Sequence, residues 1–103
     1  HPNSFFSGVF YLKTLPNDRI EFQSPNDTFT SLFEIKKYNE FNCKMQWVDI
    51  EKHDLILFRS SLWHQVPVNK TIDDRISLSF NTWVSGTVGE ELDRTEVISA
   101  GIV

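Results

Sequence analysis

The chain has 103 residues, a formal net charge of −4 and a pI of about 5.2. This length suits a single domain spanning residues 1–103, and the acidic balance argues against a nucleic-acid surface, which is expected to be basic. The sequence has no apolar run near the roughly 18 residues of a membrane span. One cysteine, Cys43, excludes an internal disulfide and fits a reducing compartment, so we expect a cytoplasmic protein.

The first half of the chain predicts three strands. Residues 4–12 are rich in aromatic and β-forming residues, and the turn signal at residues 16–18 separates them from the alternating segment at residues 19–23. We expect these two strands to pair as a hairpin. Residues 28–43 fit either a short helix or an irregular excursion and are a candidate wall of a substrate pocket. Residues 45–50 predict the third strand.

The second half predicts short strands at residues 55–58 and 63–66, then a long alternating strand at residues 75–84. The last has an apolar face (Ile76, Leu78, Phe80) and a polar face (Arg75, Ser77, Ser79). The apolar face could pack between two sheets, or the polar face could line a cavity, as in a barrel. Beyond Gly86 the signal weakens: Gly86 and Gly89 indicate a turn, and residues 96–103 a last strand or an ordered tail.

Six or seven strands without a long helix predict an all-β sandwich or jelly roll. Trp47, Trp63 and Trp83 are expected in the core, and Trp63 could also shape a site beside His64. Strand-like sequence follows residue 1 almost at once, so we expect a fragment that lacks N-terminal elements of its domain. Such a fragment would expose a sheet edge, and we expect it to form a homodimer that covers this edge.

The chemistry-bearing residues flank one loop. His64 ends one predicted strand, and Arg75 enters the next, eleven residues later. A neutral imidazole is a common ligand of catalytic first-row metals, and an arginine fork suits a carboxylate. On neighbouring strands of a barrel the two could address one cavity, as an iron site with a dicarboxylate co-substrate requires.

Three segments carry a family resemblance: residues 1–12 (HPNSFFSGVFYL), residues 53–67 (HDLILFRSSLWHQVP) and residues 74–81 (DRISLSFN). With them the chain resembles the catalytic core of 2-oxoglutarate and Fe(II)-dependent oxygenases over residues 1 to about 83. More narrowly, it resembles a branch of that family found in marine bacteria and their phages. The resemblance implies a double-stranded β-helix, that is, a cupin-like jelly roll.

The resemblance also implies an activity and its site. Iron would be held by His1 and His64, with no catalytic residue beyond the metal ligands. Arg75 would hold the far carboxylate of 2-oxoglutarate, helped by Tyr11 and, more weakly, Ser77. The reaction would convert 2-oxoglutarate and O₂ to succinate and CO₂ while hydroxylating a substrate that the sequence does not identify.

The chain departs from the family pattern near its start. The first histidine of the family's His-x-His pair would lie two residues before His1, and His1-Pro2-Asn3 has no acidic third residue. The metal site is therefore expected to be one ligand short. Arg59 replaces a usual proline, and His53, expected at the solvated surface, replaces a usual glycine.

Plainer interpretations remain open for each of these residues. His1 could be a flexible terminal residue, Tyr11 an ordinary core tyrosine, and Arg75 the partner of Asp73 or Asp74 in a surface ion pair. The whole domain could be a non-catalytic jelly-roll binding module that retains remnants of a metal site. A metal-dependent cupin without 2-oxoglutarate is disfavoured, because it would need a denser cluster of histidines and glutamates.

Overall fold

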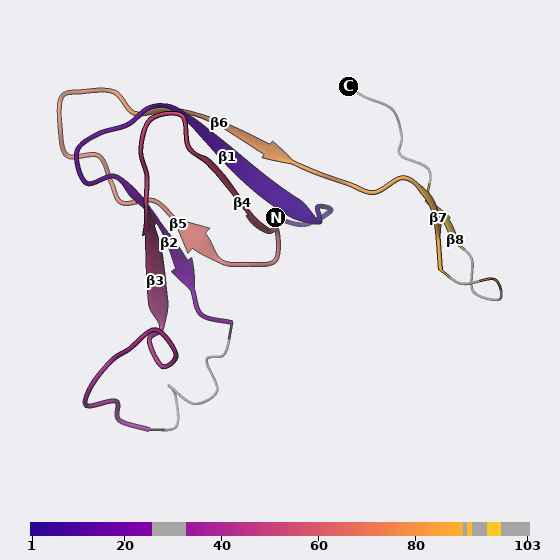
Figure 1. Ribbon diagram of the computed structural model, residues 1–103, viewed down its shortest axis with the longest axis horizontal. Coiled ribbons are helices and arrows are strands. Elements are labelled where there is room, and N and C mark those ends of the chain that lie inside the picture. Colours follow the sequence, from indigo (N-terminus) through magenta and orange to yellow (C-terminus); the bar gives the residue numbers. More distant parts are fainter. Residues whose placement is uncertain (26–32, 90, 92–94, 98–103) are drawn as a thin grey trace.

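The chain folds into antiparallel β-sheets in the computed structural model, which describes residues 1–25, 33–89, 91 and 95–97. This part of the chain is all-β: two three-stranded sheets and a separate two-stranded pair, without a helix (Figure 1). Accordingly, the described residues contain no helix of the length and apolarity that crossing a membrane would require. The all-β class predicted from the sequence is confirmed.

Each of the two larger sheets is built around a central strand. The first sheet has β1 (Phe6–Lys13) between β4 (Leu55–Arg59) and β6 (Ile76–Asn81). The second has β2 (Arg19–Gln23) between β3 (Met45–Asp49) and β5 (His64–Gln65). The separate pair is β7 (Gly86–Val88) with β8 (Thr95–Val97), and it lies away from both sheets (Figure 1).

The predicted hairpin between the first two strands is wrong, because β1 and β2 belong to different sheets. Both edges of β1 are taken by β4 and β6, so residues 14–18 carry the chain across to the second sheet. Tyr11 of β1 and Ile20 of β2, each 1% exposed, then meet in the core. The connection serves to bring two apolar strand faces together and leaves the strand edges to other partners.

The core between the two sheets is small. Its buried apolar side chains are Tyr11, Ile20, Ile50 and Phe58, with Val9, Phe22, Ile56 and Leu62 packed against them. The radius of gyration is 18.0 Å, whereas a compact domain of this length has about 13 Å. The sheets meet at one end and diverge from it (Figure 1), so they cover each other only in part.

Strand β6 turns its polar side chains toward the second sheet. Ser77 and Ser79 stand opposite Tyr11 and Val9, the β1 residues that belong to or pack against the core. Of the two arrangements that the alternation allowed, the polar face therefore lines the space between the sheets. The strand is also shorter than residues 75–84, because Arg75 precedes it and residues 82–85 follow it.

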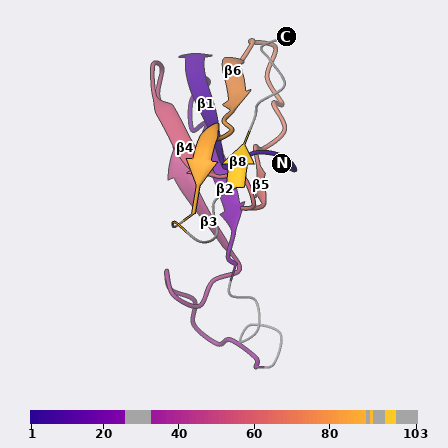
Figure 2. The same ribbon diagram turned by 90° about the vertical axis from the view of Figure 1, so that its right-hand side faces the viewer.

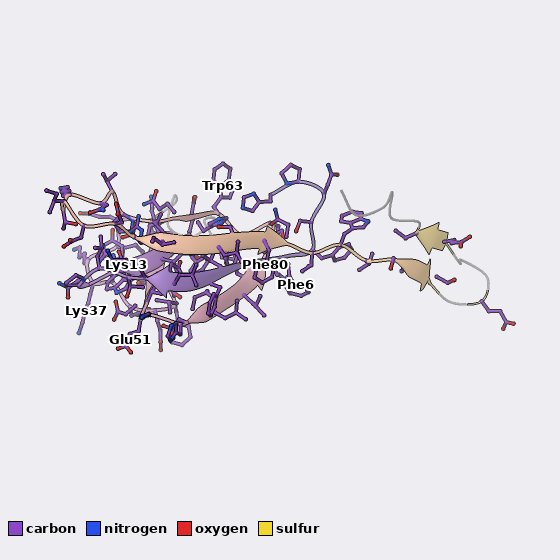
Figure 3. All side chains as sticks on the ribbon, turned by 90° about the horizontal axis from the view of Figure 1, so that it is seen from above. Phe6, Lys13, Lys37, Glu51, Trp63 and Phe80 are labelled. Carbon is purple, nitrogen blue, oxygen red and sulfur yellow. The ribbon has the colours of Figure 1, made fainter. Side chains whose placement is uncertain are left out.

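The opposite face of the first sheet is apolar and exposed. We call this the outer apolar face; it comprises Phe6, Leu12, Leu55, Leu57, Ile76, Leu78 and Phe80. Figure 3 labels Phe6 and Phe80 on it. From the exposed fractions of these side chains the face presents roughly 600 Å², more than most soluble monomers leave uncovered in one patch.

A close contact on this face explains Gly8. Gly8 pairs with Leu57 on one side and Phe80 on the other, and the Phe80 ring lies over its Cα. A Cβ atom at Gly8 would come within 2.3 Å of Phe80 Cζ. A glycine in a strand interior commonly marks such a close approach, and an aromatic ring across a strand pair compensates for the missing side chain.

The expectation that the tryptophans lie in the core is wrong. Trp47, Trp63 and Trp83 are each more than half exposed. Side chains alternate between the two faces of β3, and Trp47 is on the face away from the core. Its ring lies under the Arg19 guanidinium at 5.0 Å. Trp83 packs edge-on against Phe5 at 5.3 Å, beyond the end of β6.

Two irregular regions complete the fold. The described part of the predicted helix or excursion, residues 33–43, is irregular and lies below the sheets (Figure 2), and residues 28–32 are outside the described residues. With Met45, Gln46 and Trp47, residues 38–40 and 43 line a cavity of about 430 Å³. At the other end, Thr95–Val97 forms the last described strand, and residues 98–103 of the predicted tail are not described.

Candidate metal and co-substrate site

His64 is held in a defined orientation at the end of the core. It begins β5, stands opposite Phe22 of β2, and its ring packs against Phe58 at 4.5 Å between centroids. Its Nδ1 lies 3.0 Å from the carbonyl oxygen of Leu62. A carbonyl only accepts, so Nδ1 carries the proton and Nε2 keeps its lone pair for a metal ion. This is the arrangement in which an outer hydrogen bond orients a histidine ligand.

His1 lies beside His64 and is anchored there. Its backbone amine donates a hydrogen bond to the carbonyl oxygen of Ser60 at 2.5 Å. Ser60 is itself buried, and its hydroxyl shares hydrogen bonds with those of Ser4 and Ser7. The N-terminus and β5 accordingly lie close together in both ribbon views (Figures 1 and 2).

The spacing of the two imidazoles suits a shared ion. Their ring centroids are 5.2 Å apart and the planes are tilted by 52°. Two imidazoles on one first-row ion, at metal–nitrogen distances of about 2.1 Å, have centroids roughly 4.5–5.5 Å apart. The two predicted metal ligands are thus brought together by the fold, 63 positions apart in the sequence.

The histidine pair borders an open cavity of about 550 Å³, lined by residues 1–2 and 60–64. Trp63 stands at this cavity with most of its ring in solvent, and in Figure 3 it projects from the molecule on the side away from Phe6. Among the described residues, no cluster of three or more histidine, cysteine, aspartate or glutamate side chains could complete a metal site. The two neighbouring histidines are therefore one side chain fewer than the three protein ligands of a facial triad.

Arg75 lies at the other end of the core, where the two sheets meet. Its Nη1 donates to Oδ1 of Asp18 at 2.8 Å, and its Nη2 donates to the carbonyl oxygen of Pro67 at 3.1 Å. Both charged side chains are largely buried, with 17% of Arg75 and 7% of Asp18 exposed. The expected alternatives for the ion pair, Asp73 and Asp74, are wrong: the partner is Asp18, 57 positions earlier.

Tyr11 adds an unused polar group to this end. Its hydroxyl is buried and, alone among the buried side-chain polar atoms of the described residues, has no hydrogen-bond partner. Burial raises the pKa of Tyr11; the nearby Arg75 guanidinium lowers it, and the Asp18 carboxylate raises it further. Ser77, the weaker candidate, stands opposite Tyr11 in the β1–β6 pair.

The two groups are separated along β2. His64 stands opposite Phe22, and Asp18 directly precedes the strand, four residues earlier. Four strand residues span about 13 Å. The histidine pair and the Arg75–Asp18 ion pair thus lie toward opposite ends of one small core.

Two residues that hold this region together are not indicated by any pattern in the sequence. Asp18 was assigned to a turn, although its carboxylate is the buried partner of Arg75. Ser60 lies between two predicted strands and has no distinguishing pattern, although it anchors His1 and two further serines. The short side chain of aspartate in a Pro-Asn-Asp turn is the only local hint, and it indicates a capped turn as readily as an ion pair.

These features define an all-β protein with a pair of neighbouring histidines at one end of its core and a buried Arg75–Asp18 ion pair beside Tyr11 at the other. The chain belongs to the family described as "Putative 2OG-Fe(II) oxygenase", whose model matches residues 1–81. The family recognised from the sequence is thereby confirmed. A search of the curated proteins finds no match.

The donor set fits the groups that the family implies. The Leu62 carbonyl occupies Nδ1 of His64 and leaves Nε2 available, His1 lies next to this ring, and imidazoles suit iron. At the far end of the core, the Tyr11 hydroxyl has no partner and lies near the Arg75 guanidinium. Both groups are donors from which a carboxylate could accept hydrogen bonds.

Proposed function

We propose that the chain is the core of an Fe(II)- and 2-oxoglutarate-dependent dioxygenase that hydroxylates a C–H bond of its substrate. The observation that carries the proposal is the pairing of His1 with an oriented His64 at 5.2 Å, in a chain of this family. Supporting it, the Arg75–Tyr11 end lies at the opposite end of the same core. The proposed fold is the double-stranded β-helix, with which the two antiparallel sheets are compatible.

The proposed roles follow from the chemistry of each side chain. His1 and His64 hold the iron, and a third ligand lies outside the described groups. Arg75 and Tyr11 bind the far carboxylate of 2-oxoglutarate, Arg75 by charge and Tyr11 by its hydroxyl, with Ser77 as an auxiliary donor. When bound, iron and 2-oxoglutarate would supply the oxidising chemistry, giving succinate and CO₂.

The protein's own contribution is orientation and exclusion of water. The Leu62 carbonyl and the Phe58 ring fix His64 before any ligand arrives, so little freedom is lost on binding. The cavity of about 550 Å³ beside His64 is where a substrate would approach, with the exposed Trp63 at its border. We further propose that the protein belongs to the marine bacterial and phage branch and acts in the cytoplasm, the latter supported by its single cysteine.

The competing function is a non-catalytic jelly-roll binding module. The incomplete metal cluster of the described residues favours it. Such a module would bind neither iron nor 2-oxoglutarate through these side chains. The two functions therefore differ in a direct binding measurement.

The test is an anaerobic titration with Fe(II) and 2-oxoglutarate, which follows the weak visible charge-transfer band of the chelated co-substrate. His64→Ala should remove the band, and Arg75→Ala should weaken co-substrate binding. His53→Ala is the matched control, because His53 lies in the exposed turn between β3 and β4. If the folded wild-type protein gives no band, or keeps it in His64→Ala, the proposed function is wrong.

A further inference from the structure

Arg75 already holds a carboxylate, and that carboxylate is its own chain's. The Asp18 contact is short, buried and charged at both ends. A guanidinium has five N–H donors; one points to Asp18 and one to the carbonyl of Pro67. The pair also cancels the positive charge that would attract a dianion, so the arginine as it stands is a weak receptor for a second carboxylate.

The neighbouring Tyr11 marks this place as a ligand site as well as a structural ion pair. Its hydroxyl is buried beside Arg75 and lacks a partner, although Asp18 is close enough to influence its pKa. A buried hydroxyl without a hydrogen bond costs about 1–3 kcal/mol. If the Arg75–Asp18 ion pair served stability alone, the Tyr11 hydroxyl would be expected to have a hydrogen-bond partner. A ligand carboxylate that binds here could be that partner.

Asp18 also has a second interaction to retain if it leaves Arg75. Its other carboxylate oxygen, Oδ2, accepts a hydrogen bond from the backbone N–H of Leu15 at 3.0 Å, within the turn before β2. The backbone N–H of Asp18 donates to the carbonyl oxygen of Leu15 at 3.2 Å. These contacts are local, so the carboxylate can release the guanidinium without unfolding the turn.

We propose that Asp18 is an internal stand-in for the far carboxylate of 2-oxoglutarate, and that it sets the affinity for the co-substrate by competing for Arg75. The proposal rests on the proposed function, since it assumes that Arg75 is the co-substrate's receptor. Binding then exchanges one carboxylate for another at Nη1 and gives the Tyr11 hydroxyl an acceptor. The unliganded protein stays folded because its buried arginine is never left without a counter-charge.

Removing the charge of Asp18 should therefore strengthen binding. Asp18→Asn keeps an acceptor for Leu15 and leaves Arg75 uncompensated, so we expect 2-oxoglutarate to bind roughly ten- to a hundred-fold more tightly, the range of one charged hydrogen bond. The same substitution should lower the melting temperature of the unliganded protein, and saturating 2-oxoglutarate should restore it.

The experiment measures 2-oxoglutarate affinity by calorimetry on the full 103-residue chain, together with melting temperatures. The variants are Asp18→Asn, Arg75→Ala and Asp74→Asn, the last being a control that removes an exposed carboxylate next to Arg75 in the sequence. Asp18→Ser, which also keeps a side-chain acceptor, replaces Asp18→Asn if that variant does not fold. The monoacid 2-oxobutyrate, which lacks the far carboxylate, should bind equally to wild type and to the Asp18 variant.

The outcomes separate the two proposals. Tighter binding in the Asp18 variant alone, lost with Arg75→Ala, supports the competition. Binding that needs Arg75 but is unchanged or weaker without Asp18 overturns it and leaves the proposed function standing. No binding by the wild-type protein refutes both proposals.

Discussion

Replacing Gly8 with alanine tests the packing of the outer apolar face most directly. The added Cβ would lie 2.3 Å from Cζ of Phe80 and 2.7 Å from each Cε. These are the far atoms of one ring, and Phe80 is 38% exposed. We therefore expect the ring to swing outward toward solvent while the backbone of β1 stays in place.

The size of the effect follows from two opposing contributions. Uncovering the buried part of the ring, roughly 120 Å², would cost at most about 3 kcal/mol, and overpacking of this kind typically costs about 1–3 kcal/mol. Alanine is favoured over glycine in a strand by about 0.5–1 kcal/mol. The net expectation is a loss of about 1 kcal/mol in the free energy of unfolding, or a melting temperature lower by about 4–8 °C.

The assay is urea unfolding of a double-mutant cycle with Phe80→Leu, which removes the three clashing atoms. In the Phe80→Leu background Gly8→Ala should be neutral or slightly stabilising, since only the strand preference is left. The reasoning is refuted if Gly8→Ala is as stable as wild type. It is refuted equally if the loss is the same size in both backgrounds.

Three further predictions concern the stability and association of the unliganded protein. Tyr11→Phe removes the unpartnered hydroxyl and should stabilise the unliganded protein by about 1 kcal/mol. Because burial raises the folded-state pKa of Tyr11, the wild-type protein should lose stability above the ordinary tyrosine pKa of about 10. Urea unfolding at alkaline pH should show a smaller loss of stability in the variant. His53 has a positive φ of 76°, a left-handed conformation that favours glycine, so His53→Gly should raise the free energy of unfolding by about 0.5 kcal/mol. His53→Ala keeps the left-handed strain and should not raise it. Equal melting temperatures for the two variants would contradict this. The outer apolar face should make the chain self-associate, a contact distinct from the edge-covering homodimer, which stays a prediction. Leu57→Lys with Leu78→Lys should shift sedimentation toward monomer, and a wild-type chain that is already monomeric at high concentration would count against this.

The positions of the strands could be predicted from the sequence, but their partners could not. Alternation tells which residues share a face, and it correctly kept open the polar-inward arrangement of Ser77 and Ser79. It carries no information on which strand takes each edge, so the link between β1 and β2 suited a hairpin and a crossover equally. The tryptophans were misplaced because large apolar residues were assumed to be interior, whereas Trp47 points away from the core and Trp63 and Trp83 lie outside the strands.

The candidate site shows the same division. His64 and Arg75 stand out because their residue types and spacing indicate a metal and a carboxylate, and the structure places His1 against His64 as the resemblance implied. Asp18 could not be found in this way, because its partner lies 57 positions away and only the crossover of the chain brings them together. Local sequence indicates candidate site residues, whereas only the topology reveals that Asp18 is the partner of Arg75.

The placement of β1 in the middle of its sheet also dictates an order of folding. Its partners, β4 and β6, begin 49 and 70 positions after it begins, whereas β2 and β3 are separated by a shorter stretch. Pairings this distant form slowly, so during synthesis this aromatic strand emerges well before both of its partners, and its sheet cannot close until residue 81 has been made. The chain should therefore depend on chaperones more than its length suggests, and its yield should respond to translation speed through residues 55–81.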